Sequence, residues 1–504
     1  MKKSIIIYIC LMLSFSLLFC SCSVKNNNEG KTDENTPSDR NADGQGEENS
    51  IILPCSLADS LNPFFAEGNE NILLASLSYE SLFRVKSDYT PEALLADTFT
   101  VTKTSVEVTI KSSKFSDGSS VGVQDVIYSF TKAKNSPAYS QNLINVQSAK
   151  ADGNKITFAL YSPDIFALNI LTFPVVKNGT AEKTDSVPVG SGAYVYSDSQ
   201  YIKNDNYGSE VKLNSIRLYN IVSFEYASNA VEIGNVNFLF DDLSLGKYER
   251  IEADNVHIGL NNLVYLGLNN SYGALTSSAV RAAVYYAVDK NELSSSAYQG
   301  YGKAAPALFN PNYSGAADLD AGSSYDASKA QNILTKSGYT KYSKSGVLTD
   351  GKNELKFNLL VNSDNGFRST AAQHIAEALG FLGFSVTVES LPADKYIAKI
   401  AAGDFQMYLG EIKLTENMDF SQFFKDGGAV SKGIDKTLSV CSKYTEFCEG
   451  TIGADVFVNS FLDDVPFVPI CYREGVAFFK SGINPDFSYA ESSLYGNIVK
   501  WTEK

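Results

Sequence analysis

The sequence predicts an α/β fold with more than one domain, and two observations carry this prediction. Between Leu355 and Leu409, strand-like and helix-like segments alternate in the order β-α-β-α-β. Strands connected through helices pair in parallel, and the helices then cover the faces of the sheet. The second observation is the length, because a chain of 504 residues exceeds what a single hydrophobic core usually supports.

Each element of the β-α-β-α-β unit has its own signal. A strand starts at Leu355, and a helix follows over 369–382, where apolar residues recur at helical spacing. Val386 and Val388 mark the second strand. Pro392 stands at the start of the next helix, which is expected to end at Gly403 before a strand over 405–409. Ligands of such sheets bind outside the carboxyl ends of the strands.

The stretch Lys114–Phe130 predicts a strand end, a tight turn and a helix. Asp117-Gly118 is a turn pair, because glycine accepts the positive φ that a tight turn needs. Gly122 marks the expected start of the helix. Its apolar face is formed by residues spaced at i, i+3, i+4 and i+7, namely Val123, Val126, Ile127 and Phe130.

Further elements are expected on both sides of the parallel unit. Apolar strands are predicted over 264–268, 466–470 and 476–479. One continuous helix is predicted over 276–293, with Ser277 or Ser278 as its cap. Asp326 is the expected cap of another helix, which should stop at Gly338.

The first 22 residues have the pattern of a secretory signal peptide. Lys2 and Lys3 precede an apolar run that is shorter than the ~20 residues of a membrane span. The run ends at Ser21-Cys22, which resembles a bacterial lipobox with Cys22 as the lipidated residue. The segment 23–50 is polar and charged, so it cannot bury enough apolar surface to fold. We expect it to tether the folded body to a lipid anchor.

Composition excludes several classes of function. The net charge of −15 argues against nucleic acid as a partner, because phosphate binding requires a basic surface. Only His257 and His374 are available as histidine ligands and no CxxC motif occurs, so we expect no metal site and no cofactor. Outside the cytoplasm a disulfide is possible, and Cys441 and Cys448 are its nearest candidates in the sequence.

A series of short motifs resembles family 5 of the bacterial extracellular solute-binding proteins. The signature of that family runs approximately F-x-D-G-x-x-x-x-A-x-D-V-x-x-S-F, and Phe115–Phe130 matches it, except that Val123 replaces the usual Ala and Ser116 the common His. Six further motifs agree with the family in order and spacing. They lie at 59–64, 79–83, 88–96, 188–194, 280–290 and 325–339.

The resemblance implies a two-lobe, periplasmic-binding-protein-like (class II) fold with an additional domain inserted in lobe I. Lobe I is then discontinuous, and lobe II is a single segment. The implied domains begin after the signal peptide (1–22) and the tether (23–50). They comprise lobe I at 51–80, 189–272 and 481–504, the inserted domain at 81–188, and lobe II at 273–480.

The resemblance also suggests where a ligand is held. Peptide-binding members hold the α-amino group with a carboxylate after the last strand of the parallel unit, and here Asp419 is the first candidate, with Glu416 and Glu411 as alternatives. Peptide binders usually carry a Trp in this stretch, which this chain lacks. Arg368 resembles the position from which some members reach a ligand carboxylate. Tyr265 and Asn269 are weaker candidates.

An enzyme is the main alternative to a binding protein. Ser129 and Lys132 form S-x-x-K, residues 363–365 read S-D-N, and residues 480–482 approximate K-T-G, which is the motif order of penicillin-recognising serine enzymes. Ser129 would lie deep within a helix, however, and the gap to Ser363 is far too long. Gly190-Ser191-Gly192 lacks the third glycine of a nucleotide loop. We therefore expect no enzymatic activity.

The resemblance predicts a lipid-anchored substrate-binding protein of an ABC importer that captures short peptides and delivers them to a permease. The expected partners are the permease and ATPase subunits, and the protein itself is expected to be a monomer. It would lie on the outer face of the cell membrane, or in the periplasm of a Gram-negative host. A nickel chelate, a sugar or an opine on the same fold is the alternative ligand, and the sequence fixes neither ligand length nor affinity.

Overall fold

The structure is a computed structural model, and it describes residues 50–503 apart from 306, 317–318 and 320–324. The predicted signal peptide, Cys22 and the tether lie outside the described residues. Within the described part of the chain, no helix is both long and apolar enough to cross a bilayer.

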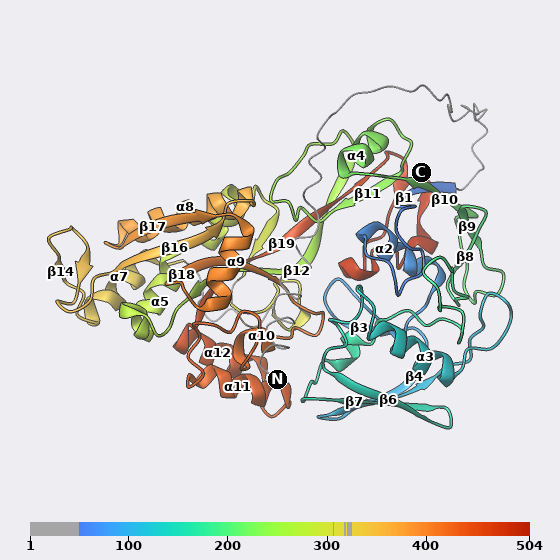
Figure 1. Cartoon of the computed structure of the whole chain (residues 1–504), viewed down its shortest axis with the longest axis horizontal. Helices are drawn as coiled ribbons and strands as arrows, with labels where there is room; N and C mark the ends of the chain where they lie inside the picture. Colours follow the sequence, from blue (N-terminus) through green and yellow to red (C-terminus); the bar gives the residue numbers. More distant parts are fainter. Residues whose placement is uncertain (1–49, 306, 317–318, 320–324, 504) are drawn as a thin grey trace, which may run out of the picture.

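The chain forms two lobes connected by long strands (Figure 1). Lobe I contains a four-stranded sheet in the order β1-β10-β9-β8, in which β1 and β10 are parallel. Helix α2 packs beside this sheet, and the C-terminal segment returns to it. The bounds are β1 Ser50–Cys55, α2 Asn69–Ser78, β8 Tyr194–Ser197, β9 Gln200–Lys203, β10 Ser215–Asn220, α4 Phe224–Glu232, β20 Ile483–Asn484, η4 Glu491–Ser493, η5 Ile498–Lys500 and β21 Thr502–Glu503.

The inserted domain follows α2 and has its own antiparallel sheet, β4-β5-β7-β6, covered by α3. Helix α3 begins after Gly122, as predicted, and the Asp125 carboxylate accepts a hydrogen bond from the Gly122 N–H at 2.8 Å. The bounds are β2 Phe83–Val85, β3 Pro91–Ala93, β4 Ala96–Val101, β5 Ser105–Ile110, α3 Val123–Ala133, β6 Val146–Asp152, β7 Lys155–Leu160 and η1 Ala167–Ile170.

Lobe II contains the predicted β-α-β-α-β unit. Strand β16 pairs in parallel with both β17 and β18, and α8 and α9 provide the crossovers. Helix α9 begins after Pro392 and ends at Gly403, which adopts a φ of 75° as an αL cap. The bounds are β16 Lys356–Asn362, α8 Gly366–Phe381, β17 Ser385–Leu391, α9 Ala393–Ala402 and β18 Met407–Lys413.

Two long antiparallel strands, β12 and β19, cross from lobe I into lobe II (Figure 1). The sequence predicted only the apolar core of β12, which in fact spans Asp254–Leu268. The prediction of two separate late strands is wrong, because β19 runs without a break over Phe467–Phe479. Its Arg473-Glu474-Gly475 segment broke the apolar pattern, yet it is buried between neighbouring strands.

The prediction of one continuous helix over 276–293 is also wrong. The structure has two helices there, α5 (Ser278–Ala287) and α6 (Lys290–Ser296), because Val288 is extended and Asp289 caps the start of the second helix. The Asp326 cap is confirmed, since its carboxylate accepts a hydrogen bond from the Lys329 N–H at 2.7 Å. The remaining bounds are β11 Phe238–Asp241, η2 Gly273–Thr276, β13 Gly302–Ala304, η3 Ser314–Ala316, α7 Ala327–Lys336, β14 Lys341–Tyr342, β15 Leu348–Thr349, α10 Ser421–Phe424, α11 Ser439–Cys448 and α12 Ala454–Asp464.

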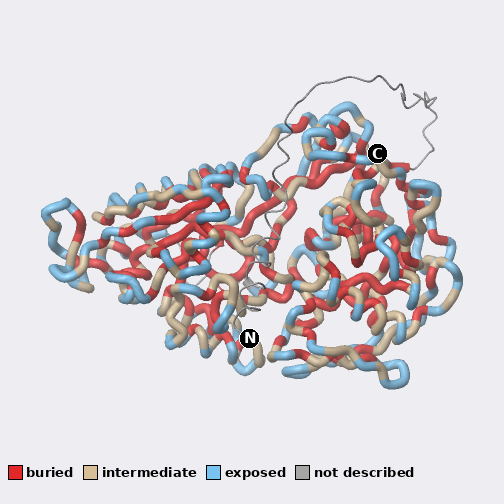
Figure 2. Tube along the Cα trace, viewed as in Figure 1, coloured by how far each residue is buried: buried red, intermediate tan, exposed pale blue. Residues whose placement is uncertain are grey.

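Within the described residues, the buried apolar side chains form three clusters. Figure 2 shows along the backbone where the buried residues lie. The largest lies mainly in lobe II, the second within the inserted domain, and the third around α2, β1 and Trp501 in lobe I. The domain boundaries given above stay a prediction.

The Gly190-Ser191-Gly192 segment is structural. A Cβ atom at Gly190 would lie 2.0 Å from the Ser78 carbonyl oxygen, and one at Gly192 would lie 2.5 Å from the Ser78 carbonyl carbon. The two glycines therefore let the backbone pass directly beside the end of α2.

The disulfide suggested for Cys441 and Cys448 is not present, because the four cysteines of the described residues are free. Both residues belong to α11 and are seven positions apart, which corresponds to about 10 Å along a helix axis. A disulfide requires Cα atoms less than about 7 Å apart.

Lys290 is buried in lobe II and makes one hydrogen bond, from its ammonium to the Ala305 carbonyl at 3.1 Å. Burial lowers the pKa of Lys290 to about 7. The unfolded chain then binds one more proton than the folded chain between pH 7 and the ordinary lysine pKa, so the free energy of unfolding should rise through this window by about 1.4 kcal/mol per pH unit. We expect Lys290→Met to remove this contribution. Urea unfolding of both proteins from pH 7 to 9 measures it, and parallel pH profiles would contradict it.

Candidate functional site

A cavity of about 240 Å³ lies where lobe I, the inserted domain and the segment after β18 meet. We call it the Glu416 cavity. It is lined by residues of α2, of the inserted domain, of 413–416 and of the C-terminal segment 490–499. Tyrosines contribute much of its wall: Tyr79, Tyr89, Tyr139, Tyr207 and Tyr495.

Glu416 is the most unusual group of this cavity. Its side chain is 9% exposed. One carboxylate oxygen, Oε1, accepts a hydrogen bond from the Ser492 hydroxyl at 2.5 Å, whereas the buried Oε2 has no hydrogen-bond partner. Burial raises the pKa of Glu416 to about 7, and the neighbouring Glu491 contributes to this increase. A buried acceptor without a donor is costly for the free protein, and a ligand donor at Oε2 would remove that cost.

The two cationic side chains of the cavity already have partners. The Lys413 ammonium lies 3.0 Å from the Glu491 carboxylate. The Arg84 guanidinium pairs with Glu92 at 3.1 Å, and it lies over the ring of Tyr489. Glu491 is thereby occupied, whereas Glu80 and Glu416, the other carboxylates that line the cavity, have no cation within ion-pair distance among the described residues. Of these two, Glu416 is the one with a buried oxygen that lacks a hydrogen-bond partner.

Backbone contacts fix the segment that carries Glu416. The Asn261 side-chain amide donates to the carbonyls of Leu414 and Thr415, at 3.3 and 2.9 Å. On the other side, the Asn169 amide of the inserted domain donates to the Glu416 carbonyl at 2.9 Å. These contacts join β12, the inserted domain and the segment after β18 at one point.

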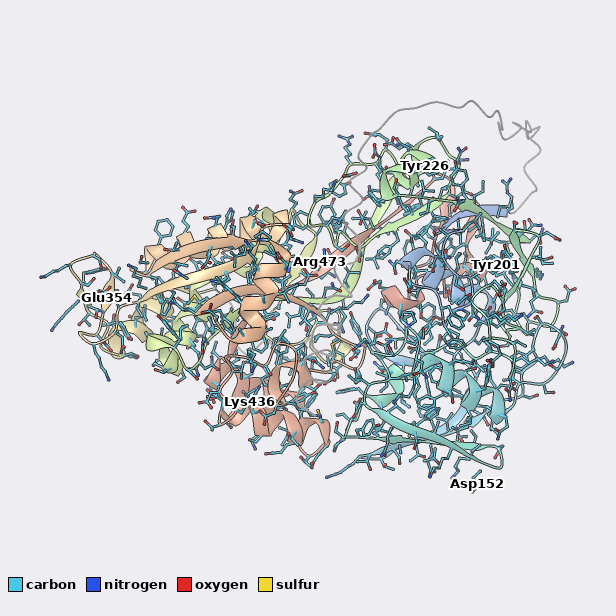
Figure 3. The ribbon with its side chains drawn as sticks, in the orientation of Figure 1. Asp152, Tyr201, Tyr226, Glu354, Lys436 and Arg473 are labelled. Atoms are coloured by element: carbon cyan, nitrogen blue, oxygen red, sulfur yellow. The ribbon has the colours of Figure 1, made fainter. Side chains whose placement is uncertain are left out.

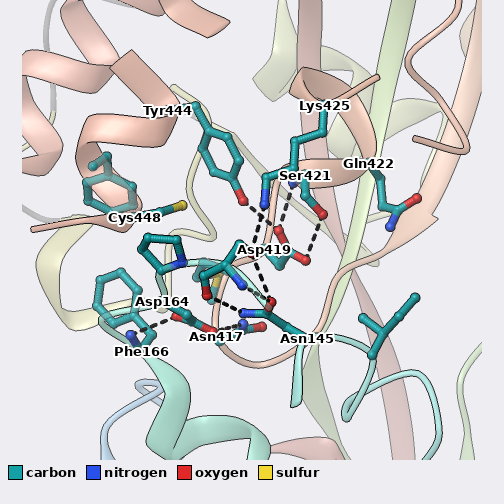
Figure 4. Close-up of a pocket in the computed structure, with 15 residues that line it drawn as sticks. Asn145, Asp164, Phe166, Asn417, Asp419, Ser421, Gln422, Lys425, Tyr444 and Cys448 are labelled. Carbon is teal, nitrogen blue, oxygen red and sulfur yellow. Dashed lines mark hydrogen bonds between the residues drawn. The ribbon is translucent and has the colours of Figure 1, made fainter. Parts of the chain in front are cut away.

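Asp419, the first candidate from the sequence, lies in a different cavity of about 180 Å³ (Figure 4), which we call the Asp164 cavity. Its carboxylate accepts hydrogen bonds from the Tyr444 hydroxyl at 2.5 Å and from the backbone and hydroxyl of Ser421, both at 2.8 Å. These bonds connect the start of α10 to α11. The Asp419 carboxylate is therefore occupied by contacts that stabilise the fold.

Glu411 and Arg368 approach each other near the carboxyl ends of the lobe II strands, together with Arg473 of β19. Figure 3 labels Arg473. The Arg473 Nε lies 2.7 Å from the Glu411 carboxylate, and the Asn262 amide donates to the same oxygen at 2.9 Å. Burial alone would raise the pKa of Glu411, but the guanidinium groups of Arg473 and Arg368 hold it below its ordinary value. Glu411 is thus neutralised within the protein.

Arg368 is less fully paired than Arg473. Its Nε is 4.0 Å from the second Glu411 oxygen, which is beyond hydrogen-bond distance, and this buried nitrogen has no hydrogen-bond partner. With two arginines and one glutamate, the cluster carries a net positive charge at the end of the sheet where ligands of this topology bind.

The two remaining candidates have structural contacts. Tyr265 is 1% exposed, and its hydroxyl bonds to that of Tyr408 at 3.0 Å within the core of lobe II. The Asn269 amide donates to the Phe405 carbonyl at 2.9 Å. Neither residue lines the Glu416 cavity or the Asp164 cavity.

The residues of the alternative enzyme motif do not form a site. The Ser129 hydroxyl is buried in the inserted domain and accepts a hydrogen bond from the Val176 N–H at 2.9 Å, whereas Lys132 pairs with Glu182. Ser363 belongs to lobe II, directly after β16. Throughout the described residues, no three His, Cys, Asp or Glu side chains are grouped as metal ligands would be.

Residues 90–427, more than half of the chain, match the family model described as Bacterial extracellular solute-binding proteins, family 5 Middle. The chain belongs to this family. Two curated relatives are the nickel-binding periplasmic protein of Escherichia coli K12 (23% identical) and the oligopeptide-binding protein AppA of Bacillus subtilis 168 (24% identical). These matches cover 59% and 55% of this chain, and 62% and 56% of the relatives, which is less than two thirds of their length.

Solved structures show the same fold over nearly the whole described chain. The unliganded open form of the murein tripeptide binding protein MppA superposes with a TM-score of 0.75 at 15% identity, covering 91% of this chain and 98% of that one. NikA of Brucella suis with Fe(III)-EDTA gives 0.66 at 17% identity (90% and 100% covered), and AppA of Bacillus subtilis with a nonapeptide gives 0.55 at 17% identity (91% and 99% covered). These likenesses confirm the predicted two-lobe fold.

The sequence did not single out the C-terminal residues of the site in this family 5 protein. Glu491 and Ser492 reach the Glu416 cavity from a short 3₁₀ helix near the end of the chain. No local pattern identifies them, because their place depends on the return of the C-terminal segment to lobe I.

The raised pKa of Glu416 predicts how binding of an ammonium ligand depends on pH. The carboxyl group must be ionised to pair with an ammonium, so the affinity should rise as the pH increases from 6 to 7 and Glu416 loses its proton. We expect Kd to fall about fivefold over this range and then to level off toward pH 8, because the peptide α-amino group, with a pKa of about 7.7–8.0, begins to lose its own proton. Titration calorimetry of a free-amine peptide measures the change, and a Kd that is constant from pH 6 to 8 would contradict it.

Proposed function

We propose that this family 5 protein captures short peptides through their free N-terminus and passes them to the permease of an ABC importer. The observation that carries the proposal is the buried Glu416 carboxylate, whose Oε2 lacks a donor within a cavity bounded by lobe I and the inserted domain. An α-ammonium group supplies both the positive charge and the hydrogen bond that this oxygen lacks.

Arg368 supports a second contact from lobe II. Its incompletely paired guanidinium could meet the carboxylate of a ligand when the two lobes approach each other. A ligand held by Glu416 at its amino end would then lie with its other end toward Arg368.

The proposal includes the cellular context expected from the sequence. Secretion, lipidation at Cys22 and a tether over 23–50 would hold a monomeric binding protein outside the membrane, next to its permease and ATPase. The protein would perform no chemistry on its ligand. The binding proteins named as relatives support this role, since all of them are named for a ligand and none for a reaction.

A thermal-shift panel tests the peptide proposal. Peptides of two to six residues, each with a free or an acetylated N-terminus, are compared with nickel–histidine, glutathione, sugars and an opine. A ligand at 100 times its Kd stabilises the folded protein by about 2.7 kcal/mol. We expect shifts from free peptides that acetylation removes. A shift from a nickel chelate alone would favour the second candidate, which the nickel-binding relative supports.

A further inference from the structure

Glu416 and Asn417 are consecutive, yet their side chains line different cavities. Glu416 faces the Glu416 cavity, whereas Asn417 faces the Asp164 cavity between the inserted domain and lobe II (Figure 4). A contact that fixes the position of the Asn417 side chain therefore also restricts the backbone next to the candidate ligand carboxylate.

Asn417 is held by the inserted domain. Its side-chain Nδ2 donates to the Asp164 Oδ2 at 2.7 Å, and this bond is buried. The other Asp164 oxygen accepts from the Phe166 N–H at 2.9 Å, and the Thr415 hydroxyl donates to the Asn417 Oδ1 at 2.5 Å. Each polar atom of the Asp164–Asn417 pair thus has a defined partner, so the pair has one preferred orientation.

Asp164 is itself anchored against lobe II. It is 7% exposed, and the ring of the nearby Phe166 packs against Phe447 and Tyr313 of lobe II, with centroid distances of 5.7 and 5.9 Å. A hydrogen bond that a charged carboxylate accepts in such surroundings is stronger than one between neutral groups. The inserted domain therefore supplies a rigid support for the segment 415–417.

We propose that Asp164 is a positioning residue for ligand binding, because its hydrogen bond to Asn417 holds Glu416 in the orientation that receives the ligand. This inference rests on the proposed function of Glu416. The affinity of the Glu416 cavity then depends on a contact between the inserted domain and lobe II that touches no ligand.

Exchanging the Asp164 and Asn417 side chains distinguishes a role in positioning Glu416 from a general role in the stability of the protein. In Asp164→Asn the single side-chain oxygen can accept from the Asn417 amide or from the Phe166 N–H but not from both, and Asn417→Asp places two carboxylates together, so each single variant loses a bond that holds this segment. The double variant Asp164→Asn/Asn417→Asp can re-form it with the donor and acceptor reversed, and Phe166 and Thr415 keep their acceptors. Lys103→Ala is the control, because Lys103 joins the inserted domain to lobe II through Glu449 and not through residues 414–420.

Calorimetry with trialanine gives one readout, and hydrogen exchange at the Met418 amide gives a second that needs no ligand, since this N–H bonds to the Thr415 carbonyl at 3.0 Å. We expect each single variant to bind about tenfold more weakly and to exchange about tenfold faster. The double variant should recover both values, and Lys103→Ala should match the original protein.

Single variants that bind within twofold of the original protein, or a double variant as weak as the singles, would overturn the positioning role. If the original protein binds neither trialanine nor any free peptide of the thermal-shift panel, the peptide proposal fails. The exchange data then decide the inference alone: recovery in the double variant supports it, and unchanged exchange in the singles overturns it.

Discussion

Replacing Glu416 by Gln should weaken the binding of free-amine peptides about 100-fold. Removing one partner of a buried, hydrogen-bonded charge pair costs about 2–5 kcal/mol of binding free energy, and tenfold in Kd corresponds to about 1.4 kcal/mol. Gln keeps the size of the side chain and an oxygen for Ser492, but it has no charge for the ammonium. The same change should not weaken N-acetylated peptides further, and calorimetric titration of matched peptide pairs measures both effects.

Asp419→Asn is the matched control for this prediction. Asp419 was the first candidate from the sequence, but its carboxylate is occupied by Tyr444 and Ser421. We expect this variant to bind peptides within about twofold of the original protein, although it should be less stable because a bond to a charged group contributes about 1.5–3 kcal/mol. A large loss of affinity in Asp419→Asn together with an unaffected Glu416→Gln would reverse the assignment.

The second large effect should come from Arg473→Leu, which we expect to lower the free energy of unfolding by about 3–5 kcal/mol, because it leaves the buried Glu411 carboxylate without its hydrogen-bonded cationic partner. Arg368 is 4.0 Å from Glu411 and cannot replace that bond. The double variant Arg473→Leu/Glu411→Leu should recover most of the loss, since it removes both charges. Urea unfolding of the three proteins measures these differences.

A surface ion pair provides the comparison. Arg250 and Glu252 form a pair at 3.0 Å with side chains that are 80% and 72% exposed, so Arg250→Leu should change stability by less than about 1 kcal/mol. Equal losses of stability in Arg250→Leu and Arg473→Leu, or a double variant that is less stable than Arg473→Leu, would contradict this prediction. They would show that burial does not determine how much the Glu411 cluster contributes to the free energy of unfolding.

The parallel unit of lobe II could be predicted from sequence because its signals are local. Helix α9, for example, lies between Pro392 and Gly403, both of which act within one turn of the helix end. The division between α5 and α6 was missed, because one continuous helix was predicted over 276–293, whereas the Asp289 carboxylate accepts hydrogen bonds from the Asn291 and Glu292 N–H groups and so starts a new helix.

From the sequence, the position of the protein carboxylate that contacts the ligand could be predicted only to within a stretch of nine residues. Glu411 lies within β18 and Glu416 and Asp419 follow it, and the sequence does not say which way each of these acidic side chains points. Their orientations depend on distant residues: Arg473 for Glu411, Asn169 and Asn261 for the Glu416 segment, and Tyr444 for Asp419. Each of these partners lies at least 25 positions away along the chain.

The long strands β12 and β19 were underpredicted for a related reason. Their polar residues, such as His257 and Glu474, pair with each other across the two strands, with 3.0 Å between the imidazole and the carboxylate. A pairing that satisfies polar groups across a sheet interrupts the apolar pattern on which strand prediction depends.

A crystal structure of the protein with a bound short peptide would test the central claim most directly. We predict that the lobes close on the peptide and that its α-amino nitrogen lies within hydrogen-bond distance, about 2.7–3.2 Å, of the Glu416 Oε2. A peptide whose amino group instead contacts Asp419 or Glu411, or lies free of any carboxylate, would contradict the assignment of Glu416 as the group that recognises the ligand.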